Sequence, residues 1–278
     1  MEIANNILKY YLKNVYFITG TAYAGKSTAV KMLAERYGMI CCGENFHSAV
    51  SDVIASPERQ PNIHYLNTLT DWKQFVTRFP EEYAKWAAGV AREAAQFEVA
   101  ALLSLPKDRK AIVDTNIPVG ILKEISDFRR VAVMLSPQSM SVERFFERGD
   151  AEKQFLLKTI ESCEGPDAVF ENFRQGLALV NSREAYDEFA GSGFFTLVRE
   201  EDGRDTREEV CGKLARHFGL MRRTFICRAR KAHLFPNMKR GKMIFRRIFS
   251  SSLPIFMERA SIICSIRQKI PCGICNTA

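Results

Sequence analysis

The chain of 278 residues lacks an uninterrupted apolar run of the roughly 18 to 20 residues that a helix needs to cross a bilayer. Its first segment, residues 1–20, also lacks the basic start, apolar stretch and small-residue cleavage site of a signal peptide. We therefore expect a cytoplasmic protein. A hydrophobic fraction of 46% and a charged fraction of 26% are ordinary for a globular chain of this length.

The body of the chain lacks a basic excess, although the net charge is +8. Residues 221–278 contain thirteen of the 40 Lys and Arg residues and a single one of the 32 Asp and Glu residues. Residues 1–220 therefore contain 27 basic and 31 acidic residues. The charge therefore says nothing about a nucleic-acid partner of residues 1–220. We interpret 221–278 as a basic, poorly ordered extension. The disfavoured alternative is a surface for nucleic acid or anionic membrane, built on the mixed basic and apolar segment 239–249.

Paired metal-ligand motifs are also scarce. Histidine occurs four times, and Cys272-x-x-Cys275 has no second such pair and no neighbouring histidine pair to complete a zinc site. In a cytosolic chain the cysteines are expected to be free thiols. A structural zinc site in the C-terminal segment is disfavoured.

What the sequence does contain is an alternation of strand and helix patterns over residues 14–220. Strands are expected at 14–19, 39–42, 110–114, 131–135 and 194–198. Helices are expected at 27–37, through most of 46–105, and at 138–148, 151–162, 167–189 and 206–218. This order predicts one α/β domain at 1–220 with a doubly wound, mostly parallel sheet.

A phosphate-binding motif, Gly-x-x-x-x-Gly-Lys-Ser, follows the first expected strand and opens a helix, which is the context that a P-loop requires. Glycines allow the backbone to turn its N–H groups towards phosphate oxygens, and the start of the helix adds its positive dipole end. Lys26 is expected to reach the β- and γ-phosphates of ATP, and the Ser27 hydroxyl to ligate Mg²⁺. The residues expected to bind the nucleotide are Gly20, Thr21, Ala22, Tyr23, Ala24, Gly25, Lys26, Ser27 and Thr28.

Two acidic residues are candidates for the chemistry beside this loop. Asp114 ends the third expected strand, where a carboxylate would hold Mg²⁺ together with Ser27; the alternative is a turn-capping role. Glu44 follows the second strand and would accept a proton from an attacking hydroxyl, or else be a solvated loop acid. Asp52 is a weaker substitute for Glu44, and His47 is interpreted as structural or substrate-contacting.

Arg144 and Arg148 are four residues apart, so they share one face of a helix after the fourth strand. Cations placed there would stabilise the charge that spreads over a transferred phosphoryl group. Lys153 follows closely.

With this order of motifs, residues 14–220 resemble the small-molecule kinases of the P-loop NTPases, above all the nucleoside, nucleotide and shikimate kinases. The resemblance implies a three-layer α/β/α fold, a five-stranded sheet in the order 2-3-1-4-5, a helical insertion after strand 2 that binds the acceptor, and a mobile lid after strand 4. It makes Glu44 the acceptor-site acid and Arg144 and Arg148 the lid arginines. It also places the loop 199–204 beside the nucleotide base.

The sequence leaves the acceptor open, because it departs from the family's acceptor motifs. No Asp-x-Asp follows the second strand, and the third strand ends in Asp114-Thr115-Asn116-Ile117-Pro118 where adenylate kinases have Asp-Gly-Phe-Pro. We expect a kinase that uses ATP and Mg²⁺ on a small-molecule hydroxyl or phosphate acceptor, with ATP against GTP undecided. The alternative is a nucleotide-dependent ATPase switch without such an acceptor. The lack of Asn-Lys-x-Asp and of Leu-Ser-Gly-Gly-Gln disfavours regulatory GTPases and transport ATPases.

Overall fold

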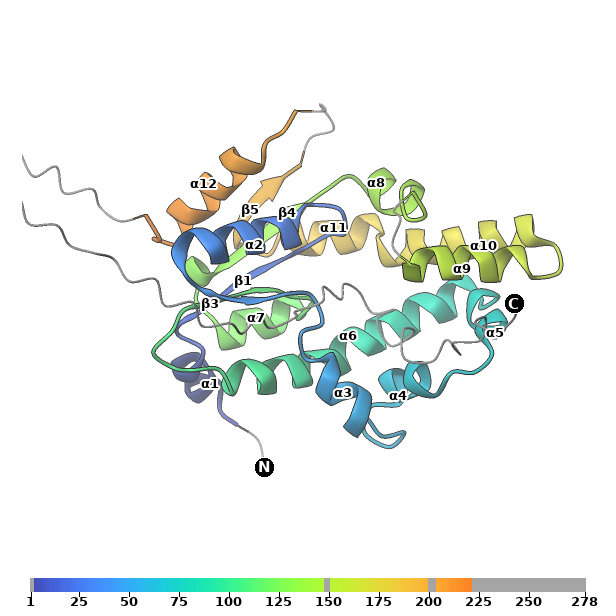
Figure 1. Ribbon diagram of the computed structural model, residues 1–278, viewed down its shortest axis with the longest axis horizontal. Coiled ribbons are helices and arrows are strands. Elements are labelled where there is room, and N and C mark those ends of the chain that lie inside the picture. The colour runs from blue at the N-terminus through green and yellow to red at the C-terminus, as the bar shows by residue number, and fades with distance from the viewer. Residues whose placement is uncertain (1–2, 148–150, 200–203, 222–278) are drawn as a thin grey trace, which may run out of the picture.

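The computed structural model describes residues 3–147, 151–199 and 204–221 (Figure 1). Arg148, the centre of the loop 199–204 and the segment 222–278 lie outside the described residues, and so do the predictions made for them. Within the described part, no helix is both long and apolar enough to cross a membrane.

The centre of the fold is a five-stranded sheet in the order β2-β3-β1-β4-β5, and every neighbouring pair is parallel. The expected mostly parallel sheet is therefore parallel throughout, and the expected order 2-3-1-4-5 is confirmed. The strands are β1 (Val15–Gly20), β2 (Ile40–Cys42), β3 (Ala111–Asp114), β4 (Val131–Leu135) and β5 (Phe195–Val198). β1 occupies the middle, and its residues are all buried.

Helices cover both faces of the sheet because side chains alternate along each strand. Tyr16 and Ile18 of β1 pack in one hydrophobic cluster with α2 (Lys26–Tyr37) and α12 (Arg207–His217). Phe17 packs on the opposite face, in a second cluster with the end of α6 (Pro80–Leu103), with α7 (Val119–Ile125) and with Leu12, which follows α1 (Asn5–Tyr11). Figure 1 shows α2 and α12 on one side of the strands and α7, α1 and α6 on the other. α1 was not expected from the sequence.

A helical half lies beside the sheet and is built from two insertions (Figure 1). After β2 come α3 (Ser48–Ile54), α4 (Pro61–Thr68), α5 (Trp72–Val76) and α6. After β4 come α8 (Gln138–Glu143), α9 (Ala151–Glu161), α10 (Pro166–Val180) and α11 (Arg183–Ala190). Phe75 and Trp86 of the first insertion share one hydrophobic cluster with Leu156 and Phe173 of the second. The expected insertion after β2 is thus present; α9 and α10 pack on it, whereas α11 packs on β4.

Two helix boundaries differ from the expectation. The helix expected at 167–189 is broken, because α10 ends at Val180 and the Ser182 hydroxyl accepts a hydrogen bond from the Ala185 N–H to cap α11. The helix expected at 138–148 ends at Glu143.

Candidate active site

The glycine-rich loop between β1 and α2 has a backbone that only glycine fits at two points. Gly20 has a φ of +128°, and a Cβ on it would lie 1.9 Å from the carbonyl oxygen of Met134. Gly25 has a φ of +91° and immediately precedes α2. The first N–H groups of α2 have no partner within the helix, so they can bind an anion at the end of β1.

This loop is fastened to the segment after β4. The Thr21 N–H donates to the Met134 carbonyl at 3.0 Å, and the Ser136 N–H donates to the Thr21 hydroxyl at 2.7 Å. The Ser136 and Ser141 hydroxyls both donate to the Ala22 carbonyl. The sequence analysis did not single out these serines, because only the three-dimensional fold brings them to the loop.

The predicted phosphate and magnesium residues lie together at the start of α2. Lys26 is 8% exposed, and its Nζ donates to the Thr21 carbonyl at 3.1 Å. The Ser27 hydroxyl donates to Oδ2 of Asp114 at 2.6 Å. Burial raises the pKa of Asp114 to about 6, with Lys26 opposing the rise, Glu44 adding to it and the hydrogen bond from Ser27 opposing it. Asp114 is therefore tied to the loop and not to a turn cap. Thr28 lies exposed in the first turn of α2.

Two further carboxyl groups lie within electrostatic range of Asp114. Glu44 accepts a hydrogen bond at 3.0 Å from the Asn116 side chain, which ties the loop after β2 to the loop after β3. Glu98 on α6 is 3% exposed, and burial raises its pKa to about 8. A hydrogen bond from the Thr115 hydroxyl opposes that rise, and the charges of Asp114 and Glu44 add to it. The sequence analysis missed Glu98, whose only signal is an acid inside a helix rich in alanine.

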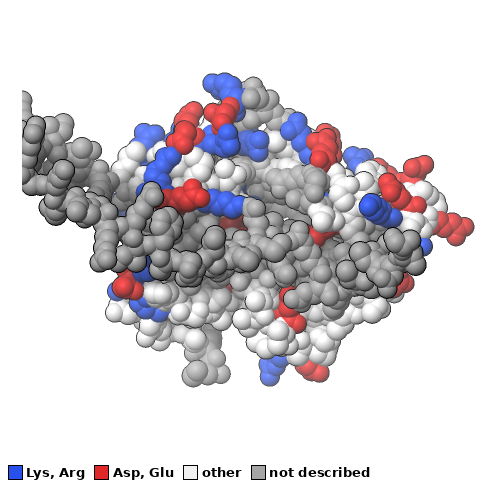
Figure 2. All heavy atoms as spheres, viewed as in Figure 1, with Lys and Arg blue, Asp and Glu red and all other residues white. Residues whose placement is uncertain are grey.

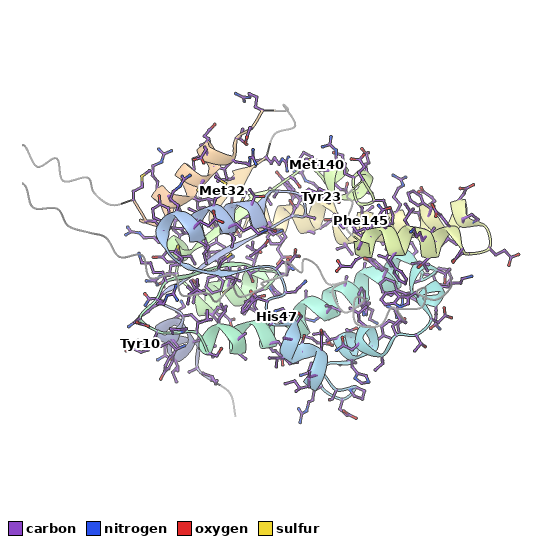
Figure 3. The ribbon with its side chains drawn as sticks, in the orientation of Figure 1. Tyr10, Tyr23, Met32, His47, Met140 and Phe145 are labelled. Carbon is purple, nitrogen blue, oxygen red and sulfur yellow. The ribbon has the colours of Figure 1, made fainter. Side chains whose placement is uncertain are left out.

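His47 lies at the same edge and is neutral in its surroundings. It is 5% exposed, and burial lowers its pKa to about 4. Figure 3 places His47 beside the start of α3, away from Tyr23 and the glycine-rich loop. Asp52, the weaker alternative acid, is half-buried on α3. His47 is thus a buried, uncharged side chain, as the structural or substrate-contacting role expected for it requires.

Two cations bond to the loop at Tyr23 in the described part of the chain, and neither is one of the two arginines expected there, of which Arg148 lies outside the described residues. Tyr23 donates its hydroxyl to the Arg144 carbonyl at 2.8 Å, whereas the Arg144 guanidinium lies 3.9 Å from Glu147 and is half-exposed. Lys153 of α9 is 7% exposed and donates to the Tyr23 hydroxyl at 3.4 Å. Arg199 donates to the Tyr23 carbonyl at 2.7 Å. Lys153 and Arg199 therefore bring positive charge to the loop, and Figure 3 shows Tyr23 beside α8 and Phe145.

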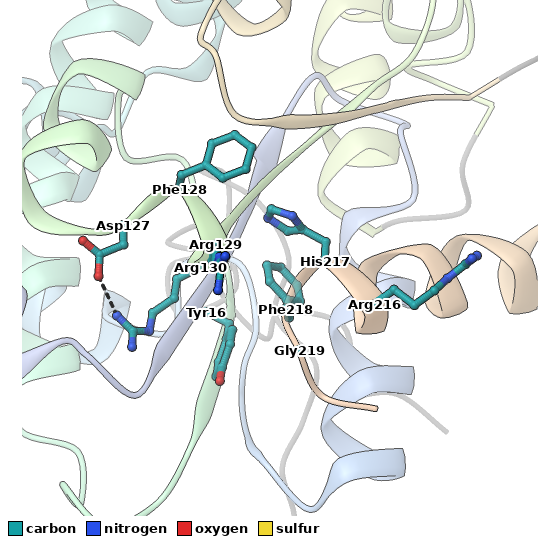
Figure 4. Close-up of a pocket in the computed structure, with 9 residues that line it drawn as sticks. All are labelled: Tyr16, Asp127, Phe128, Arg129, Arg130, Arg216, His217, Phe218 and Gly219. Atoms are coloured by element: carbon teal, nitrogen blue, oxygen red, sulfur yellow. Dashed lines mark hydrogen bonds and ion pairs between the residues drawn. The ribbon is translucent and has the colours of Figure 1, made fainter. Parts of the chain in front are cut away.

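A hollow of about 680 Å³ lies at the opposite, amino-terminal edge of the sheet (Figure 4). Arg130 on its rim pairs with Asp127 at 2.9 Å, and His217 forms a 2.9 Å hydrogen bond with the Val131 carbonyl. Arg129 and Arg216 are exposed. Figure 2 shows acidic and basic residues interspersed on the visible face of the described part, with no extended patch of one sign. The arginines around this hollow are therefore either exposed or paired.

The donor set at the start of α2 suits magnesium bound together with phosphates. Within the described residues no three His, Cys, Asp or Glu side chains are placed to hold a metal by themselves. Mg²⁺ is usually held by one or two protein oxygens together with phosphate oxygens. Ser27 and Asp114, with Oδ1 of Asp114 buried and without a partner in the described part, fit that pattern.

A scan against protein-family models gives no match, and a search of the curated proteins gives none either. The geometry of the site is therefore the basis on which a function can be proposed.

Proposed function

We propose that this chain is a kinase that transfers the γ-phosphate of ATP, with Mg²⁺, to a hydroxyl of a small molecule, and that residues 1–220 form a P-loop NTPase fold. The observation that carries the proposal is the 2.6 Å hydrogen bond between Ser27 and Asp114 beside the buried Lys26. The sheet order supports it. Because β1 lies between β3 and β4, its carboxyl end is a topological switch point, where open parallel sheets bind ligands.

Ser27 and Asp114 are the residues that would hold magnesium. When bound, Mg²⁺ would neutralise charge on the β- and γ-phosphate oxygens. The glycine-rich loop would bind those oxygens through its N–H groups, and Lys26 would move its ammonium from the Thr21 carbonyl to a phosphate.

The remaining side chains would orient the acceptor and stabilise the transition state. Glu44 would accept the proton of the attacking hydroxyl, because it lies at the edge where β2 and β3 end and acts on Asp114 electrostatically. Lys153 and Arg199 would supply the positive charge predicted for lid arginines, since both already bond to Tyr23 of the loop.

Transfer of labelled phosphate by the full chain tests this proposal. The chain would be incubated with Mg-ATP and a panel of nucleosides, nucleotides, sugars and shikimate-like alcohols, and nucleotide binding would be measured separately by titration with a fluorescent ATP analogue. Lys26→Ala is the test variant. Lys31→Ala, an exposed lysine further along α2, is the matched control.

Acceptor-dependent transfer that Lys26→Ala abolishes and Lys31→Ala retains would support the kinase. Nucleotide binding that depends on Lys26 without transfer to any acceptor would favour the ATPase switch. Nucleotide binding unaffected by Lys26→Ala would contradict both.

A further inference from the structure

Polar side chains with unsatisfied atoms gather near the carboxyl ends of β2 and β3. Native interiors pair nearly all of their buried polar groups, so such atoms need an explanation. Four buried side-chain atoms of this region have no hydrogen-bond partner among the described residues, namely Asn45 Nδ2, His47 Nδ1, Glu98 Oε1 and Asp114 Oδ1. The Glu44–Asn116 hydrogen bond joins the two loops that carry most of them. The region therefore offers both donors and acceptors to a polar molecule.

Three of the four ionisable side chains that act on one another in this region of the described chain are acids, of which Glu98, with its pKa raised to about 8, is uncharged near neutral pH. Glu44 acts on both Asp114 and Glu98, and Asp114 acts on Glu98. Lys26 is the only cation among the charges that shift these two acids in the described part of the chain. In the proposed kinase, Lys26 binds the phosphates of ATP. Anions such as phosphate and carboxylate are normally bound by arginine forks or lysines, so the region is unsuited to an anionic acceptor.

A second buried acid on α6 shows what a purely structural carboxylate looks like in this chain. Glu93 is 8% exposed, and both of its oxygens accept hydrogen bonds from the start of α4: from the N–H and side-chain amide of Asn62 and from the Ile63 N–H. Glu98 is buried more deeply on the same helix and is hydrogen-bonded by the Thr115 hydroxyl and the Asn116 backbone, yet its Oε1 has no partner in the described part of the chain. Burial alone therefore does not explain Glu98.

We propose, building on the kinase function above, that the acceptor is an uncharged hydroxyl compound recognised by Glu44, Glu98 and His47, and that acceptors bearing phosphate or carboxylate are rejected. Hydroxyl groups would donate to the carboxyl oxygens and to His47, and the Asn45 amide would donate to a hydroxyl oxygen. In the transfer, the acceptor oxygen forms a bond to the γ-phosphorus while the bond from that phosphorus to the β–γ bridging oxygen breaks. The hydroxyl proton passes to Glu44, and ADP leaves with the bonding electron pair.

Matched acceptor pairs that differ in one anionic group test the proposal with the full chain and Mg-ATP. The pairs are adenosine and AMP, glucose and glucose 6-phosphate, and methyl shikimate and shikimate. We expect the uncharged member of at least one pair to be phosphorylated with a kcat/KM at least tenfold above that of its anionic partner. Equal or faster transfer to the anionic member of a reacting pair would overturn the acceptor class and leave the kinase standing. No transfer to any uncharged member would overturn it as well.

Variants of the two acids on α6 separate a positioning role from a structural one. Glu98→Ala should raise the KM for the reacting acceptor at least tenfold and change the KM for ATP less than twofold. Glu98→Gln should restore most of the loss, because the amide keeps the shape, its oxygen still accepts a hydrogen bond and its NH2 group can donate to a hydroxyl oxygen. Glu93→Gln should lower the melting temperature without a selective effect on the acceptor. An unchanged acceptor KM in Glu98→Ala, or an equal change in both KM values, would contradict the role given to Glu98. Should that variant fail to fold, the acceptor pairs still decide the acceptor class with the unaltered chain.

Discussion

The two edges of the sheet carry charged groups in opposite circumstances. At the amino-terminal edge, Arg129 and Arg216 are exposed to water around a hollow of about 680 Å³, and Arg130 is paired with Asp127. At the carboxyl-terminal edge, Asp114 and Glu98 are almost completely buried, and each keeps one oxygen without a partner in the described part. Exposed charges contribute little to stability, whereas buried ones are costly. The comparison shows that buried carboxyl groups without full hydrogen bonding are a better indicator of the candidate site than the volume of a hollow.

Of the variants at the carboxyl-terminal edge, Asp114→Asn should reduce phosphate transfer the most. The amide keeps the size of the side chain but weakens a magnesium ligand, so we expect phosphate transfer to fall by about 10³-fold, or about 4 kcal/mol of transition-state stabilisation. Transfer is measured at saturating Mg-ATP, with circular dichroism as the control for folding. Transfer within threefold of the unaltered chain would remove Asp114 from the site.

Gly20→Ala should cost about 3 kcal/mol or more in the free energy of unfolding, because the new Cβ would lie 1.9 Å from the Met134 carbonyl oxygen in a left-handed backbone. Chemical denaturation measures the loss. Gly212→Ala, in α12 and with no atom within 4 Å of the added Cβ, is the matched control and should be neutral or slightly stabilising.

The contribution of Glu98 and Asp114 to the free energy of unfolding should fall as the pH rises from about 4.5 to about 8, in contrast to that of an ordinary carboxylate that gains an ionic partner. The folded-state pKa values are raised, to about 8 for Glu98 and about 6 for Asp114, so these two acids hold more protons in the folded chain than in the unfolded chain in this window, whereas His47, with its lowered pKa, acts in the opposite direction below about pH 6.5. Since one pKa unit corresponds to about 1.4 kcal/mol, Glu98→Gln should recover roughly 4 kcal/mol at pH 8 and almost nothing at pH 4.5. Urea titrations across the range test this, and a variant with the same pH slope as the unaltered chain would refute it.

Lys153→Met should lower kcat about tenfold through loss of one buried positive charge at the loop, about 1.4 kcal/mol. Lys158→Met, on the same helix, serves as its control. An equal loss in both variants would show that the effect comes from α9 as a whole.

Substitutions at the amino-terminal edge should have the smallest effect on nucleotide binding and phosphate transfer. The double variant Arg129→Ser with Arg216→Ser removes two exposed charges, so we expect nucleotide binding and transfer to change less than twofold. Titration with the fluorescent ATP analogue checks the binding. A tenfold change would erase the distinction between the two edges.

Local sequence patterns were sufficient to predict those features that are formed by residues close together in the sequence. The glycine-rich loop with its Lys26 and Ser27, the acid at the end of β3 and all five strands could be predicted in this way, because strand patterns and glycine spacing are local. The position of Glu98, the serines that fasten the loop and the shared core of the two insertions could not. Each depends on contacts between residues far apart in sequence, such as Ser136 with Ala22. Lys153 was noted only as a neighbour of the arginines, because no local pattern indicates that it bonds to Tyr23.

The continuous helix α6 limits how this protein can evolve. Its 24 residues carry the capping acid Glu93 in the helical half and Glu98 beside the sheet. Because each residue of a helix adds about 100° of rotation, one residue inserted between these two acids would turn Glu98 away from β3 while leaving the composition almost unchanged. We expect the length of this segment to be fixed across descendants more strictly than its amino acids. Lineages in which that length has drifted would be the place to look for a different substrate.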